Sequence, residues 1–135
     1  MRVVVAVAAG GVLGAEARFG MSVLLVHAPG AWPWATLLVN ISGCVLIGVL
    51  MVVLTELGGG HPLARPFLGV GVLGGYTTFS TYAVEVLQLE DAGRTAAALG
   101  YLVVTPLVAV AACAAGTAAT RVAWRRFPRP RTSRR

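Results

Sequence analysis

The stretch GGYTTFSTY at residues 74–82 interrupts an apolar segment with two glycines and four aliphatic hydroxyl groups. Glycine lowers helix propensity, and serine and threonine hydroxyls compete with a helix for backbone hydrogen bonds. We therefore expect a helix to unwind at residues 74–78. Unwound backbone offers carbonyl oxygens that bind Na⁺, and amides and hydroxyls that bind anions. A kink that only serves helix packing is the alternative interpretation.

Two aromatic residues follow this predicted break. Phe79 and Tyr82 are three residues apart, so they share one face of a helix. The edges of aromatic rings are electropositive, so an anion can lie in the plane of such a ring. The aromatic pair is consistent with an anion pathway and equally with an ordinary helix core.

A second polar pair lies in the apolar segment that starts at residue 34. Thr36 and Asn40 are four residues apart and share one helix face. An asparagine within a membrane needs a partner or a polar cavity. Its amide has two N–H donors, which suit an anion, although a helix-to-helix hydrogen bond would also satisfy it.

The last apolar segment repeats this spacing with Tyr101 and Thr105, and Ala109 lies one turn further. The two hydroxyls form a candidate polar track along one helix face. The alternative is that threonine bonds to its own helix backbone and that tyrosine lies at the membrane interface.

Charged residues within the apolar segments are functional candidates by default. Glu16 and Arg18 are two residues apart, so they point to different sides of a helix and do not pair. Arg18 either reaches the outer interface or draws anions into a vestibule. Glu85 lies near an outer end, where we expect it to reach water or an arginine.

The composition defines the elements that must position these residues. Of the 135 residues, 57% are apolar and 12% are charged, and the mean hydropathy is +0.80. These values indicate an integral membrane protein. We predict an all-α fold with four membrane-spanning helices, of which the third is broken near its middle. The expected spans are residues 3–26, 34–55, 66–89 and 95–120.

The charges predict an orientation in the cell membrane. Arginine supplies all eleven basic side chains, and they are concentrated in the segment 121–135. Basic residues favour the cytoplasmic side of a membrane and its anionic lipids. We therefore predict a transmembrane unit over residues 1–120, a basic cytoplasmic tail over 121–135, and both termini in the cytoplasm.

Small residues recur in the first apolar segment at Gly10, Gly14 and Ala17. This spacing lets helices approach closely, either between subunits or within one chain. The two cysteines, Cys44 and Cys113, fall within apolar runs, where a thiol is usually a small packing residue.

Three segments together resemble the Fluc (CrcB-type) fluoride channel family. They are GGVLGAEARFG at 10–20, WATLLVNISGCVLIG at 34–48 and GVLGGYTTFSTYAVEV at 71–86. The resemblance spans nearly all of residues 1–120. It implies an antiparallel dimer of four-helix subunits, with two fluoride pathways along the subunit interface and a structural Na⁺ at its centre. It also implies passive export of fluoride from the cytoplasm, which confers fluoride resistance.

The resemblance also implies roles for individual residues. The backbone carbonyls of Gly74 and Thr77 would hold the Na⁺ ion. Glu85 is similar to the family's acidic residue after the break. The positions that resemble the family's fluoride pathway are Arg18, Thr36, Asn40, Phe79, Ser80, Tyr82, Tyr101 and Thr105. Two of the positions depart from the pattern: Tyr82 stands where a second phenylalanine is common, and Ala109 stands where a further hydroxyl often occurs.

Two alternatives remain for the identity of the partner subunit. An antiparallel homodimer needs one sequence to insert in both orientations, which requires nearly balanced basic charge on its two sides. The arginine-rich segment after residue 120 tips that balance. We therefore favour a heterodimer with an oppositely oriented homologous subunit over a homodimer.

Other classes of function can be compared with the same residues. A small proton-coupled multidrug exporter would use a membrane glutamate such as Glu16, but this class does not account for the broken helix. A non-conducting subunit that stabilises a homologous partner is a further alternative. No nucleophile, base and orienting group share a spacing typical of an enzyme. Beside a membrane span, an arginine-rich tail indicates lipid contact and topology, so we expect no nucleic-acid partner.

Overall fold

The computed structural model describes residues 1–28, 30–56 and 61–126. Within these ranges every regular element is a helix. In chain order the elements are α1 (Arg2–Leu24), α2 (Trp34–Thr55), the π-helix η1 (Arg65–Leu73), α3 (Gly74–Tyr76), α4 (Ser80–Asp91) and α5 (Thr95–Arg126). Three of them, α1, α2 and α5, are long and apolar enough to cross a membrane. The predicted all-α class is confirmed, and the first two predicted spans agree with α1 and α2 to within two residues.

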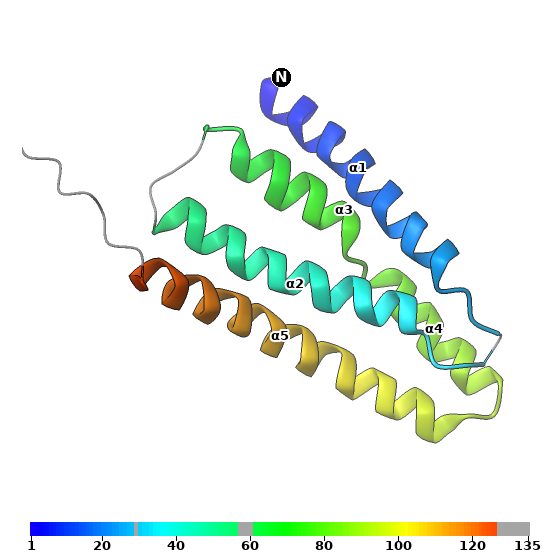
Figure 1. Ribbon diagram of the computed structural model, residues 1–135. Coiled ribbons are helices and arrows are strands. Elements are labelled where there is room, and N and C mark those ends of the chain that lie inside the picture. The colour runs from blue at the N-terminus through cyan, green and yellow to red at the C-terminus, as the bar shows by residue number, and fades with distance from the viewer. Residues whose placement is uncertain (29, 57–60, 127–135) are drawn as a thin grey trace, which may run out of the picture.

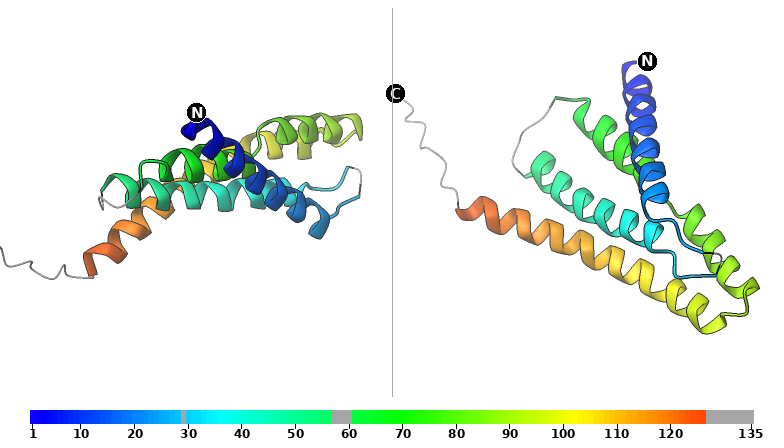
Figure 2. Two further views of the ribbon diagram at one scale, coloured as in Figure 1. Left: turned by 90° about the horizontal axis from the view of Figure 1, so that it is seen from above. Right: turned by 45° about the vertical axis from the view of Figure 1, so that its right-hand side comes forward.

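The helices form two main contacts, α1 against η1 and α2 against α5 (Figure 1). Beyond the break, α4 runs alongside the first half of α5 (Figure 2). The helix α5 continues to Arg126, six residues beyond the predicted end of the span. The part of the predicted tail from residue 127 onward lies outside the described residues.

The two ends of the helix array are each held by contacts between distant segments. At one end Gly30 and Gly93 take positive φ values of 77° and 70°, and Arg94 donates a hydrogen bond to the carbonyl of Gly30. At the other end Arg121 Nε lies 2.9 Å from Glu56 Oε1. Hydrogen bonds from this guanidinium lower the pKa of Glu56. The chain runs between these two ends four times, as α1, as α2, as η1 to α4, and as α5.

The third crossing is broken, but not at the predicted glycines. Gly74 and Gly75 are helical, and the helix ends at Thr77, whose ψ of 155° is extended. The predicted break is therefore present within residues 74–78, at the hydroxyl residues Thr77 and Thr78 and not at the glycines. Gly75 instead allows close contact with α1, because a Cβ atom there would lie 2.5 Å from the carbonyl oxygen of Gly11.

The small residues of α1 serve contacts within the chain. A Cβ atom on Gly14 would lie 2.0 Å from the carbonyl oxygen of Val72, and one on Gly10 would lie 2.4 Å from that of Phe67. A glycine also allows close contact between α2 and α5, where a Cβ on Gly48 would lie 2.3 Å from the carbonyl oxygen of Cys113. Of the two interpretations of these residues, the structure supports close contact within one chain.

The buried core lies beside the break and between α2, α4 and α5. It consists of Leu37, Tyr82, Leu89, Ala98 and Tyr101. Many other large apolar side chains are exposed, including Val4 at 70% and Leu107 at 64%. Such a surface suits lipid or another membrane helix rather than water.

Replacing Gly14 with alanine should destabilise the fold. The added methyl group would overlap the backbone of η1, and overpacking of this kind costs about 1–3 kcal/mol. This should exceed the gain of about 1 kcal/mol that alanine brings to a helix. Gly20→Ala is the matched control, because a Cβ there meets nothing within 4 Å. Thermal unfolding in detergent should show a lower midpoint for Gly14→Ala only; equal midpoints for both variants would contradict this account.

Candidate functional site

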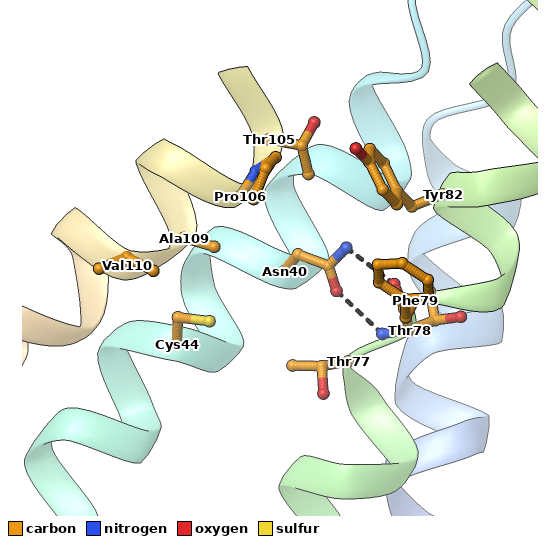
Figure 3. Close-up of a pocket in the computed structure, with 10 residues that line it drawn as sticks. All are labelled: Asn40, Cys44, Thr77, Thr78, Phe79, Tyr82, Thr105, Pro106, Ala109 and Val110. Atoms are coloured by element: carbon orange, nitrogen blue, oxygen red, sulfur yellow. Dashed lines mark hydrogen bonds between the residues drawn. The ribbon is translucent and has the colours of Figure 1, made fainter. Parts of the chain in front are cut away.

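A cavity of about 300 Å³ lies beside the break (Figure 3). Its walls come from α2, α5 and the chain on both sides of the break. The lining residues are Asn40, Cys44, Thr77, Thr78, Phe79, Tyr82, Thr105, Pro106, Ala109 and Val110. Most of this wall is apolar and only a few polar groups face it, which is the usual character of a selective binding site.

The side chain of Asn40 holds the broken backbone in place. Its Nδ2 donates to the carbonyl of Thr78 at 3.0 Å, and the N–H of Thr78 donates to its Oδ1 at 2.9 Å (Figure 3). Both residues are buried. Asn40 is therefore satisfied within the chain, by the unwound backbone between α3 and α4 rather than by another helix. It uses one of the two Nδ2 hydrogens, so a second donor remains for another acceptor.

This pairing changes the hydrogen bonds of the preceding helix. In a regular α-helix the N–H of Thr78 would donate to the carbonyl of Gly74, four residues earlier. Here that N–H is bonded to Asn40 instead. The extended ψ of Thr77 also turns its carbonyl out of the helical direction. The N–H of Thr81, the regular donor to Thr77, bonds to Thr78 Oγ1 instead. The carbonyls of Gly74 and Thr77 therefore both lose their regular α-helical donors.

Side-chain metal ligands do not gather elsewhere in the described ranges. Within residues 1–28, 30–56 and 61–126, no three His, Cys, Asp or Glu side chains are placed to hold a metal ion. The carbonyls at the break are hard oxygen ligands of the kind that Na⁺ prefers.

The two aromatic residues after the break lie together at the cavity. The ring centroids of Phe79 and Tyr82 are 5.5 Å apart, with an angle of 56° between the rings. Their burial differs sharply, because Phe79 is 78% exposed and Tyr82 only 5%. Tyr82 is part of the core of this chain, whereas Phe79 presents its ring to whatever lies outside it.

Glu85 is buried and does not reach water or an arginine, so this expectation was wrong. Its carboxylate accepts a hydrogen bond from Thr36 Oγ1 at 2.7 Å and another from the hydroxyl of Tyr101 at 2.8 Å. All three side chains are buried. The helix α4 places Glu85 between α2 and α5, so it joins three helices.

The hydroxyls of the predicted polar track behave differently from each other. Tyr101 is fully buried and bonded to Glu85. Thr105 Oγ1 is buried, and among the residues that the structure describes no hydrogen bond to it meets normal geometry. A buried hydroxyl at the cavity wall without a partner can bind a small polar ligand.

A second cavity, of about 260 Å³, lies on the other side of Thr78. Its polar lining includes Arg18, Thr36 and Thr81. The structure therefore divides the predicted pathway residues. Asn40, Phe79, Tyr82 and Thr105 line the first cavity. Ser80 and Tyr101 line neither of the two, and Ser80 is exposed, with its Oγ 3.3 Å from Thr78 Oγ1.

Two residues were given no specific role from the sequence. Thr78 is the backbone partner of Asn40 and lines both cavities. Pro106 lies inside α5 and lines the first cavity. A proline within an apolar helix was a visible signal, because it removes one backbone donor. No local sequence pattern could have paired Thr78 with Asn40, because the pairing depends on how α2 lies against the break.

Comparison with known proteins identifies relatives over most of the chain. Residues 5–117 match the model of a family described as CrcB-like protein, Camphor Resistance (CrcB). A Nocardia farcinica protein named Fluoride-specific ion channel FluC 2 is 50% identical over 119 residues, which cover 88% of this chain and 85% of that protein. Fluoride-specific ion channel FluC 1 of Streptomyces coelicolor is 51% identical over 125 residues, covering 91% and 81% respectively.

A third relative is Fluoride-specific ion channel FluC 2 of Thermobifida fusca, which is 49% identical over 119 residues, covering 86% of this chain and 88% of that protein. The match with the family model includes every residue assigned above to the two cavities. The resemblance first noted in the three sequence segments is thus confirmed. By the family model and by these relatives, the chain belongs to the CrcB-like family.

Proposed function

We propose that this chain is a subunit of a fluoride-selective ion channel in the cell membrane, an ion channel rather than an enzyme. Channel activity would let fluoride leave the cytoplasm passively and so confer fluoride resistance. The cavity beside the break is the observation that carries this proposal. It combines the amide of Asn40, the ring of Phe79 and the unpartnered hydroxyl of Thr105 in a largely apolar wall.

Fluoride demands this kind of wall because it is small and strongly hydrated. A narrow apolar path must replace its water with a few oriented donors. The second N–H of Asn40, the hydroxyl of Thr105 and the electropositive edges of Phe79 and Tyr82 are such groups. Chloride is larger and would be excluded by its size.

We place the remaining predicted pathway residues by the cavity to which they belong. Arg18 and Thr36 line the second cavity, where a cationic guanidinium would raise the local concentration of anions. Ser80 and Tyr101 support the pathway from beside it, through Thr78 and Glu85 respectively. Thr78 lines both cavities, so the break lies between these two parts of the proposed pathway.

No energy source is needed for export through this path. A membrane potential that is negative inside contributes about 2.3 kcal/mol per charge for each 100 mV towards expelling an anion. A passive pore that selects fluoride is therefore sufficient to remove it from the cytoplasm.

A second subunit would complete the pathway. Phe79 is a wall of the cavity and is nonetheless 78% exposed. An ion path through a membrane cannot open to lipid, because lipid offers no donors to replace the water of the ion. We propose that an antiparallel partner covers this face, forming two pathways along the interface.

A structural Na⁺ ion at the centre of that dimer fits the backbone at the break. The carbonyls of Gly74 and Thr77 lack their regular helical donors. Two such carbonyls from each subunit would give one cation four oxygen ligands, and hard oxygen ligands suit Na⁺. The side chain of Asn40 thereby supports the ion, because it holds the N–H of Thr78 away from Gly74.

For the domain organisation, we propose a transmembrane unit over residues 1–120 with a basic cytoplasmic tail over 121–135. Arg121 and Arg125 lie on the last turns of α5, at the end of the helix array where Glu56 follows α2. This end would face the cytoplasm, with both termini on that side. The arginines at 129, 131, 134 and 135 lie outside the described residues, and their charge would strengthen the bias.

The multidrug exporter is not supported, because family membership points to fluoride and Glu16 lines neither cavity. A subunit that only stabilises a homologous partner is distinguished by the flux experiment below.

The purified chain in liposomes should release fluoride rapidly and retain chloride, as measured with ion-selective electrodes. Phe79→Ile removes a ring edge from the pathway, so fluoride efflux should slow by about tenfold, which corresponds to roughly 1.4 kcal/mol on the barrier. Leu87→Ile is the matched control, since Leu87 is a 63% exposed apolar residue on α4, the helix that Phe79 immediately precedes.

The flux experiment has three outcomes that decide between different interpretations. Equal rates for both variants would remove Phe79 from the pathway. No efflux from the folded chain, followed by efflux after co-expression with a homologous subunit, would establish a heterodimer. No efflux in either case would overturn the channel proposal in favour of a stabilising role.

Sodium should stabilise the folded protein. The unfolding midpoint in detergent should be higher in NaCl than in KCl at equal ionic strength, because only the native break offers the carbonyl site. Asn40→Ala should abolish the difference, since it returns the N–H of Thr78 to Gly74. Thr36→Val should keep the difference, because Thr36 bonds to Glu85 rather than to the break. Equal midpoints in the two salts for the unmodified chain would count against the Na⁺ site.

The chain expressed alone should insert mainly with its C-terminus in the cytoplasm. Reporters that are active on one side of the membrane, fused to the C-terminus, would measure this. Glutamine in place of the six arginines from Arg125 onward should produce a mixture of both orientations, because it removes most of the charge bias. Equal populations for the unmodified chain would instead support an antiparallel homodimer.

A further inference from the structure

The helix α5 carries a proline at its cavity-facing side. Pro106 lies inside this helix of 32 residues and has no backbone N–H to donate. In a regular α-helix, the N–H of residue 106 would bond to the carbonyl of Leu102. This carbonyl therefore loses its regular donor at a depth where water is scarce, and leaving it without a bond would be costly.

A side chain from another helix supplies the missing donor. The hydroxyl of Tyr82, on α4, donates to the carbonyl of Leu102 at 2.6 Å. Tyr82 is 5% exposed, and the bond is partly buried. Figure 3 shows Tyr82 and Pro106 at the edge of the same cavity, on facing elements.

The bond also fixes the ring that carries the hydroxyl. The Tyr82 ring lies 5.5 Å from Phe79 and 5.3 Å from Tyr101, measured between centroids. Contacts on both sides limit its tilt, and the hydroxyl bond to α5 limits its remaining motion. The O–H donor is already used, so Tyr82 offers a fluoride ion its ring edge rather than a free hydroxyl.

We propose that Tyr82 and Pro106 form a matched pair, in which Pro106 frees the Leu102 carbonyl and Tyr82 bonds to it, so that the second aromatic ring of the fluoride pathway is held in position. This inference rests on the proposed channel function. Tyr82 is a positioning residue as well as a wall of the cavity. Its hydroxyl, which departs from the family's usual phenylalanine, is explained by the proline that faces it.

A double-mutant cycle tests the pair. Tyr82→Phe leaves the Leu102 carbonyl without its donor and releases the ring, so fluoride efflux should fall about fivefold to tenfold. Pro106→Ala restores the backbone donor to Leu102 and leaves the buried Tyr82 hydroxyl in competition for one acceptor, so efflux should also fall. The double variant Tyr82→Phe/Pro106→Ala has neither defect. Its efflux should return to within about twofold of the unmodified chain.

A matched tyrosine provides the control. Tyr76 lies on α3 and its hydroxyl is 3.0 Å from Ser42 Oγ, away from the cavity. Tyr76→Phe should lower the unfolding midpoint through the loss of that bond while leaving fluoride efflux and its response to Pro106→Ala unchanged. This separates an effect on the pathway from a general loss of stability.

The outcomes of the cycle are distinct. Additive losses, with the double variant slower than either single variant, would overturn the pairing, and so would unchanged efflux and unfolding in Tyr82→Phe. If the unmodified chain carries no fluoride, alone or with a homologous partner, the proposed function fails. The unfolding midpoints of the same four proteins then decide the pairing, because a matched pair must still be non-additive in stability.

Discussion

The paired hydrogen bonds between the Asn40 side chain and the backbone of Thr78 are the interaction on which the rest of the site depends. A chain that unwinds inside a membrane exposes an N–H and a C=O that lipid cannot satisfy. One amide side chain has the donor and the acceptor needed to satisfy both. With this pairing, α3 can end and α4 can begin in a new direction, which places Phe79 and Tyr82 at the cavity.

The same principle explains the other polar groups around the site. Pro106 interrupts the bonds of α5, and a hydroxyl from α4 compensates. Glu85 would be costly in an apolar core, and hydroxyls from α2 and α5 satisfy both of its oxygens. Most of the polar groups around the cavity are thus hydrogen-bonded to other groups of the protein. Few hydrogen-bond donors remain for an ion, and a small number of donors favours a small anion over a larger one.

The sequence predicted the helices well because apolar length is a local property. It also predicted a break in the third helix, from the two glycines and the hydroxyl residues after them; the break lies at Thr77 and Thr78, whereas Gly74 and Gly75 are helical. Local propensity could not reveal that Gly75 packs against α1, nor that Asn40 takes the N–H that would have continued the turn. Glu85 was misplaced for the same reason, since its burial depends on α2 and α5 rather than on its position along α4.

The exposure of Phe79 supports the proposal that a second subunit completes the pathway. Within the described residues, Tyr82 and Asn40 are buried by the chain itself, whereas the ring of Phe79 lies open on the outside of the same cavity. A phenylalanine facing lipid needs no special placement, but here it follows directly from a break that costs the helix several backbone hydrogen bonds. That cost is understandable if the exposed ring faces a second subunit across a pathway. In the proposed antiparallel dimer the arginine bias would be a functional constraint, because a partner would have to insert in the opposite sense for its own break to meet this one.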